Sequence, residues 1–350
     1  MTESGYNLIR RMHLKWRLHC DTRQRGVKCL GMMSHNLPDL RLITKAARLY
    51  HEERLTQTEI ANRLGISQVT VSRLLKKAEE YGIVRTTVVT PPGAFTELED
   101  LLEQKFNLDQ VVVGEASRDS EQAVLTAVGS AAAQFLESTL RPAEVIGISS
   151  WSASLLSMVD QMHPIRKAEN CLVVQMIGGI GNPSAEQHAN HLAIRLARLV
   201  QGEARFLPAP GIVGSPSAAK ILSRDPYVSE TLALFDKITL ALVGVGSLEP
   251  SALVASSGNT FSREELEALQ KSGAVGDVCL RFYDANGREI RGPLANRVIG
   301  IELERLRRVR KSVAICGGKR KLAAILGGLR GGWVNTLVTD QYTAERLAKA

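Results

Sequence analysis

Apolar positions recur with helical spacing in two short runs between residues 56 and 77. Thr56 is followed three residues later by Glu59, the spacing of a capping box, and Ser67 is a suitable N-cap for a second helix. Gly65, between the two runs, can adopt the left-handed conformation that ends a helix in a sharp turn. The pattern predicts two helices around a tight turn, with these inward positions: Ile60, Ala61, Leu64, Val71, Leu74 and Leu75.

The outward positions of the second predicted helix carry long or hydrogen-bonding side chains. This arrangement is typical of a helix-turn-helix, whose second helix reads base edges in DNA from its N-terminal half. The alternative is a helical hairpin with a solvated basic face. The small Ala61, the turn glycine and the inward β-branched Val71 all agree with the outward polar set and favour DNA binding. The predicted DNA-binding residues are Thr56, Gln57, Ser67, Gln68, Thr70, Ser72, Arg73, Lys76 and Lys77.

The flanks of this hairpin carry patterns of their own. Residues 37–50 repeat apolar positions at helical spacing and predict a supporting helix, while the β-rich stretch 83–89 predicts the strand of a small wing. Together they indicate a winged helix-turn-helix domain over residues 37–92. An amphipathic helix is expected over residues 96–106, either as a linker or dimer helix or simply packed on the domain that follows.

From residue 111 onward, short β-branched runs alternate with helical patterns. Such alternation predicts a parallel sheet covered by helices on both faces, an α/β domain of the Rossmann-like class over residues 93–350. A hairpin is expected from Cys279–Tyr283 and Glu289–Ile290, turning at residues 284–287. The expected strands of the parallel sheet are residues 111–113, 145–148, 172–177, 204–207, 238–243, 312–315 and 334–339.

Charge is distributed unevenly along the 350 residues, which carry a formal net charge of +8. Residues 1–90 hold 16 Lys+Arg against 8 Asp+Glu, whereas residues 91–350 hold 28 of each. The surplus therefore surrounds the helix-turn-helix, where DNA phosphates would need it. Residues 1–36 form a basic extension with little pattern, expected either to be a disordered arm or to precede a natural start near Met32 or Met33.

The cysteine pattern and the hydropathy of the chain indicate the cellular compartment. The five cysteines include no C-x-x-C pair and are expected to be buried, reduced thiols, so no metal site, disulfide or cofactor is predicted. No stretch reaches the length of a membrane span, and the first residues lack the apolar core of a signal peptide. We expect a cytoplasmic protein without a membrane partner.

Several loops expected at the carboxyl ends of strands are rich in serine and glycine. In parallel sheets ligands bind at this edge. The serines of residues 149–152 stand where a strand ends and a helix begins, which suits a phosphate, and Lys321 would add a positive charge. Asp277 could accept hydrogen bonds from sugar hydroxyls. No G-x-G-x-x-G fingerprint or P-loop is present. The predicted ligand-binding residues are Ser149, Ser150, Trp151, Ser152, Gly178, Gly179, Asp277 and Lys321.

Taken together, these segments resemble the SorC family (DeoR-type SorC) of sugar-responsive bacterial transcriptional regulators. The resemblance covers about residues 38–350. It rests on Thr56-Gln57-Thr58-Glu59-Ile60-Ala61 through Val71-Ser72-Arg73-Leu74-Leu75, on Gly273-Ala274-Val275-Gly276-Asp277, and on Leu337-Val338-Thr339-Asp340 with Thr343-Ala344. It implies an effector domain similar to sugar-phosphate isomerases that binds a phosphorylated sugar and controls a dimer or tetramer on operator DNA.

The same resemblance assigns roles to individual residues. It implies that Ser149–Ser152 match the family's phosphate loop, Asp277 its hydroxyl-binding acid, and Lys321 the lysine of its Gly-Gly-x-x-Lys segment. The family's loop often reads Gly-Trp-Gly-x-Thr, whereas this chain has Ser150-Trp151-Ser152-Ala153-Ser154. Whether the effector is a sugar phosphate or a related sugar or polyol therefore stays open.

The competing interpretation is an enzyme, a sugar-phosphate isomerase or deaminase on the same fold. Such an enzyme needs an acid and a base placed at the reacting carbons. Glu186, His188 and His191 share one predicted helix, but a solvated or partly buried helix face explains them as well. No second acid–base pair is evident. The sequence thus favours a ligand-responsive regulator of carbohydrate metabolism without catalytic residues.

Overall fold

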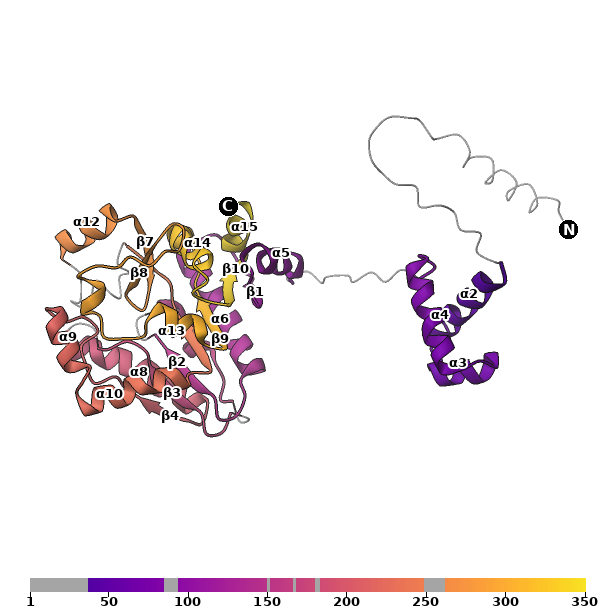
Figure 1. Ribbon diagram of the computed structural model, residues 1–350, viewed down its shortest axis with the longest axis horizontal. Coiled ribbons are helices and arrows are strands. Elements are labelled where there is room, and N and C mark those ends of the chain that lie inside the picture. The colour runs from indigo at the N-terminus through magenta and orange to yellow at the C-terminus, as the bar shows by residue number, and fades with distance from the viewer. Residues whose placement is uncertain (1–36, 85–93, 150–151, 166–167, 180–182, 249–261) are drawn as a thin grey trace, which may run out of the picture. The chain divides into compact units, whose positions relative to one another are not determined.

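A computed structural model describes residues 37–84, 94–149, 152–165, 168–179, 183–248 and 262–350 (Figure 1). The chain divides into two compact units, Met1–Val89 and Thr90–Ala350. The basic extension, the predicted wing strand beyond residue 84, Ser150 and Trp151 lie outside the described residues.

The described part of the first unit, residues 37–84, contains three helices, α2 (Leu37–His51), α3 (Gln57–Leu64) and α4 (Gln68–Glu80). The predicted capping box is present, because the Thr56 hydroxyl accepts from the Glu59 N–H while the Thr56 N–H donates to Glu59 Oε2 at 2.8 Å. Gly65 ends α3 with φ of 65°, in the left-handed region. Ser67 caps α4 by accepting from the Thr70 N–H at 3.2 Å. The predicted helix-turn-helix is confirmed.

The core of this unit consists of the side chains that the helical pattern turned inward. Ile60, Ala61 and Val71 pack with Leu49 and Leu75 where α3 crosses α4. A second cluster joins α2 to α4, so that α2 is the supporting helix expected from sequence. The opposite face of α4 is free of core contacts and carries the residues discussed below.

The second unit is built on a seven-stranded sheet in the order β1-β10-β9-β5-β2-β3-β4, and all its neighbouring strands are parallel. The α/β fold class predicted from sequence is confirmed. The strands are β1 (Gln110–Gly114), β2 (Val145–Ile148), β3 (Leu172–Gln175), β4 (Glu203–Arg205), β5 (Leu240–Val243), β9 (Lys311–Ile315) and β10 (Thr336–Asp340).

Helices cover both faces of this sheet. The α-helices described in this unit are α5 (Thr96–Phe106), α6 (Glu121–Thr139), α7 (Ala153–Gln161), α8 (Pro183–Leu199), α9 (Pro216–Leu222), α10 (Pro226–Ala233), α12 (Arg263–Lys271), α13 (Leu303–Arg308), α14 (Leu322–Arg330) and α15 (Gln341–Lys349). Val173 of β3 belongs to the core that includes α6, α7 and α8, while the next residue, Val174, belongs to the core that includes α5, α10, α13, α14 and α15. This alternation is what a doubly covered parallel sheet requires.

Helix α5 packs on the edge strand β1. Glu99 Oε1 accepts from the Val113 N–H, and Glu103 Oε1 accepts from the Val111 N–H, both at 2.8 Å. Leu102, between the two glutamates, is fully buried. Among the interpretations left open by the sequence, the structure supports the one in which this helix packs on the second domain.

A small antiparallel sheet adjoins the large one and consists of β6 (Gly246–Ser247), β7 (Ala274–Val278) and β8 (Arg281–Asp284). The expected strand Cys279–Tyr283 is wrong at its start, because Cys279 and Leu280 form the turn between β7 and β8 with φ of 52° and 60°. Neither is a glycine, so nothing in the local sequence indicates a left-handed turn there. The expected turn at residues 284–287 does form, since the Asp284 N–H donates to the Arg288 carbonyl at 3.0 Å.

Candidate functional site

The strand order of the large sheet reverses between β2 and β5. The chain runs from β2 to β3 and β4 on one side, then continues with β5 on the other side of β2. In open α/β sheets, the crevice beyond the carboxyl ends of the strands at such a reversal is where ligands bind. The serines predicted from sequence follow β2, and Gly244 follows β5.

Ser149 and Ser152 tie these two loops together. Ser149 Oγ accepts from the Gly244 N–H at 3.1 Å, and a side chain at position 244 would overlap the Ser152 hydroxyl. Ser152 caps α7 by accepting from the Leu155 N–H at 3.3 Å. Both serines are buried. The arrangement places the N-terminus of α7, with its positive end of the helix dipole, at the crevice, which favours an anion.

Asp277 lies beside the same crevice. It stands opposite Gly246 in the pairing of β6 with β7, and a side chain at position 246 would overlap its carboxylate. Asp277 Oδ2 accepts from the Leu280 N–H at 2.9 Å. Burial raises the pKa of Asp277 to about 6, although this hydrogen bond and the charge of Lys321 both lower it.

Lys321 lies in the loop that follows β9 and interacts with Asp277. It ends the short 3-10 helix η3 (Lys319–Lys321), which follows Gly317 and Gly318 after β9. Burial lowers the pKa of Lys321, while the groups of Cys316 and Asp277 raise it. The structure thus brings Asp277 and Lys321 within electrostatic range of each other. Together with the Ser149–Gly244 contact, they surround one part of the carboxyl edge.

The segment near the C-terminus positions the loop that carries Lys321. Asp340 caps α15 by accepting from the Thr343 N–H at 3.1 Å, and it also accepts from the Thr343 hydroxyl at 2.5 Å. The Thr343 oxygen in turn accepts from the Gly318 N–H at 2.7 Å. Residues 337–344, selected from sequence by resemblance, therefore hold the Gly317–Gly318 loop in place.

Gly178 and Gly179 are placed differently from the other predicted residues. The Gly178 N–H donates to the Ile299 carbonyl at 3.1 Å, and the Gly179 N–H donates to the Ala209 carbonyl at 2.8 Å. A side chain at position 178 would overlap the Ala209 carbonyl. The close approach that these glycines allow is to other backbone segments, and a contact with ligand stays a prediction.

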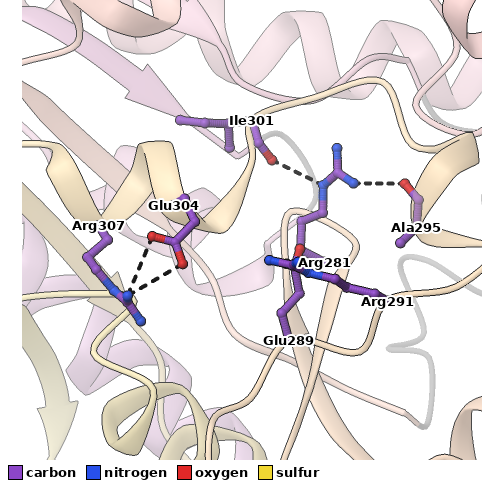
Figure 2. Close-up of polar contacts among 7 residues, drawn as sticks. All are labelled: Arg281, Glu289, Arg291, Ala295, Ile301, Glu304 and Arg307. Atoms are coloured by element: carbon purple, nitrogen blue, oxygen red, sulfur yellow. Dashed lines mark hydrogen bonds and ion pairs between the residues drawn. The ribbon is translucent and has the colours of Figure 1, made fainter.

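Arg281, which the sequence analysis missed, fixes the segment that receives the Gly178 hydrogen bond. Its guanidinium donates to the carbonyls of Ala295 at 2.8 Å and Ile301 at 3.3 Å, as Figure 2 shows. Burial lowers the pKa of Arg281. The same view shows Arg307 paired with Glu304 on α13. The carbonyls that Arg281 contacts lie 14 and 20 residues away in sequence, so no local pattern could have revealed these hydrogen bonds.

The predicted DNA-binding residues fall into two groups. Thr56 and Ser67 use their hydroxyls in helix caps, and the Thr70 hydroxyl bonds Ser67 Oγ at 2.8 Å. Gln57 is half-buried. The remaining predicted residues are exposed on α4: Gln68, Ser72, Arg73, Lys76 and Lys77. Val69, an exposed apolar side chain on the same helix, is not among the residues predicted from sequence.

The residues weighed for catalysis give no acid–base pair in what is described. His191 is exposed, and the side chains of residues 183–190, with Glu186 and His188, lie outside the description. In the part of the chain that the structure covers, no group of three or more His, Cys, Asp or Glu is placed to hold a metal ion. Of the described helices, none has both the length and the apolar character needed to cross a bilayer.

Comparisons with known proteins cover both units. Residues 90–349 match the family model "Putative sugar-binding domain", and residues 47–85 match "Winged helix-turn-helix DNA-binding". The sorbitol operon regulator of Klebsiella pneumoniae is 33% identical over 90% of this chain and 99% of its own. The deoxyribonucleoside regulator of Bacillus subtilis is 31% identical over 87% and 96%, respectively.

A solved structure agrees with these matches. The crystal structure of the full-length sorbitol operon regulator SorC from Klebsiella pneumoniae superposes with a TM-score of 0.67 at 32% identity, covering 89% of this chain and 99% of that one.

Proposed function

Because the chain belongs to the SorC family of sugar-binding bacterial transcriptional regulators, we propose that its effector is a phosphorylated sugar, or a closely related sugar or polyol, bound at the carboxyl edge between β2 and β5. The protein is a sugar-responsive regulator that binds DNA through its winged helix-turn-helix. The observation that carries the proposal for the effector is the loop after β5, where Gly244 contacts the serines that precede α7 and Gly246 lies against Asp277, which in turn interacts with Lys321.

Each group in this crevice suits a different part of such a ligand. The N-terminus of α7 and the ammonium of Lys321 favour the phosphate, because both are positive. Asp277 accepts hydrogen bonds and is the natural partner for sugar hydroxyls at the uncharged end. Its carboxylate also balances Lys321 when no ligand is bound.

The proposed regulation requires more than one chain. A two-fold operator needs a two-fold protein, so we propose a homodimer or a homotetramer as the DNA-binding form. The effector changes operator binding only to the extent that it binds one state of this oligomer better than the other. We expect the protein to act in the cytoplasm on operators of genes for carbohydrate metabolism.

We propose that the crevice senses its ligand and does not convert it. The described residues around it supply one carboxylate and one ammonium in mutual electrostatic contact, with no additional acid–base pair for proton transfer between neighbouring carbons. A turnover assay checks this directly. Incubation of the protein with any sugar phosphate that it binds should leave that compound unchanged by NMR.

Titration calorimetry on the full chain tests the assignment of the effector. Lys321→Ala should weaken binding of a sugar phosphate by about 1.5–3 kcal/mol, the range for a hydrogen bond to a charged group, and should affect the unphosphorylated sugar much less. Lys319→Ala is the matched control, because it removes the same charge from an exposed position of the same turn.

Two results would count against the proposal. If Lys321→Ala weakens both ligands equally, Lys321 is not a phosphate contact and the serine loop favours an unphosphorylated sugar or polyol. If no sugar or sugar phosphate binds the wild-type chain, the crevice is not the effector site.

A further inference from the structure

One large apolar side chain stands on the exposed face of α4. Val69 is 63% exposed, whereas the other valine of this helix, Val71, is completely buried. A β-branched residue loses side-chain freedom in a helix and gains nothing from exposure to water. The residues that the structure describes therefore offer no packing reason for a valine at position 69.

Helix geometry places Val69 at the centre of the outward face. The residues of α4 that contact the core are Val71, Leu74, Leu75 and Ala78. With 3.6 residues per turn, Val69 points directly away from this group, and Arg73 and Lys76 follow it along the same row. These two neighbours are exposed cations, so the row that contains Val69 is the row suited to enter a groove lined by phosphates.

Val69 is the second residue of α4, in the first turn of the helix that Ser67 caps. In a helix-turn-helix, the N-terminal residues of the second helix contact base edges in the major groove. The apolar group that a base pair offers there is the C5-methyl of thymine. The Ser67 and Thr70 hydroxyls on either side of Val69 are bonded to each other at 2.8 Å, and the isopropyl group is exposed between them.

We propose that Val69 reads thymine in the operator by packing its isopropyl group against the C5-methyl. This inference rests on the proposed function, since it requires α4 to enter the major groove. It adds a specificity-determining residue to a surface that otherwise recognises DNA through polar and basic groups. The prediction is a thymine at a fixed position in each half-site.

The experiment removes the methyl group first from thymine and then from the side chain of residue 69. A duplex is first selected from a randomised, unmethylated library by the wild-type full-length chain. Each thymine of that duplex is then replaced in turn by deoxyuridine, which lacks only the C5-methyl and keeps the same pairing. Wild-type binding should weaken about fourfold at one position in a half-site, the ratio that corresponds to one buried methyl group.

The variants then assign that loss to Val69. Val69→Ala should bind the thymine and deoxyuridine duplexes equally well, because its side chain no longer reaches the methyl. Val69→Thr, which keeps one of the two methyl groups, should retain part of the discrimination. Ile221→Ala is the control, since Ile221 is also a highly exposed apolar residue but lies on α9 of the other unit; it should discriminate like the wild type.

Three results would overturn the inference. The first is a duplex in which no thymine is sensitive to the replacement, and the second is a Val69→Ala variant that keeps the wild-type preference. The third is a Val69→Ala variant that changes the oligomeric state without changing the preference, which would place Val69 in a protein contact. If the wild-type chain enriches no sequence at all, DNA recognition itself fails, and this inference fails with it.

Discussion

Replacing Asp277 with asparagine should make the ligand-free protein more stable at neutral pH. The pKa of this carboxyl is raised from 3.8 to about 6 in the folded chain, chiefly by burial. Between these two values the folded state holds a proton that the unfolded state has lost, so stability falls as pH rises through this window. Above about pH 6 the buried carboxylate is ionised and lowers the free energy of unfolding by the full amount. A neutral amide at this position does not.

The pKa of Asp277 in the folded chain lies about two pH units above its ordinary value. Each pH unit corresponds to about 1.4 kcal/mol in the free energy of unfolding, so the gain from Asp277→Asn is at most about 3 kcal/mol. Asp277 is partly exposed, so solvent reduces the cost, and we expect a gain of about 1–3 kcal/mol for Asp277→Asn above pH 6. The amide oxygen can still accept from the Leu280 N–H, so this hydrogen bond survives the substitution. The same variant should bind the effector less tightly, as expected when a functional group is held at the expense of stability.

Urea denaturation at a series of pH values measures the effect, with the fluorescence of buried Trp333 reporting on the second unit. Glu264→Gln is a useful comparison, because the pKa of Glu264 is lowered and its contribution to stability is lost as pH falls. If Asp277→Asn is less stable than the wild type above pH 6, or if the two stability curves run parallel from pH 4 to 7, burial of the Asp277 carboxylate does not lower the stability and the reasoning is wrong.

Two further predictions concern DNA binding and assembly. Arg73→Ala should weaken binding to the selected operator by about 1–3 kcal/mol if the guanidinium meets a base edge, and less if it meets only phosphate; equal affinity of the two proteins in a fluorescence anisotropy titration would remove Arg73 from the reading surface. Light scattering at micromolar concentration should give at least a dimer, because a two-fold operator needs a two-fold protein; a monomer with and without operator DNA would contradict this.

The elements predicted best are those with strong local signals. The Thr56 capping box, Gly65 and Ser67 fix the bounds of α3 and α4 through contacts within four residues of each other. The strand Val145–Ile148 was predicted with its observed bounds, because a β-branched run flanked by turn residues has no competing interpretation. In these places sequence neighbours determine the structure.

The features that the sequence could not supply depend on residues far apart in the chain. Gly178 and Gly179 have the composition of a ligand loop, but their N–H groups are taken by Ile299 and Ala209, which no local pattern indicates. Cys279 and Leu280 form a turn in the left-handed conformation without a glycine, so the usual turn residues do not indicate it. For the predicted ligand-binding residues, the sequence supplies the chemical types, whereas the strand reversal between β2 and β5 depends on the order of strands in the sheet, which no local pattern indicates.

The two glutamates of α5 protect the edge strand β1 from pairing with a strand of another chain. An open strand edge is a template on which another chain can add its own strand, and parallel sheets expose two such edges. At β1 the outward N–H groups of Val111 and Val113 are already taken by carboxylates, and the helix that carries them covers the edge. A fragment trimmed to begin after Phe106 would therefore expose a bare, valine-rich strand and should aggregate, whereas one that begins before Thr96 should not. Helix α5, at the start of the sugar-binding unit, thus also prevents strand addition at the edge of that unit's sheet.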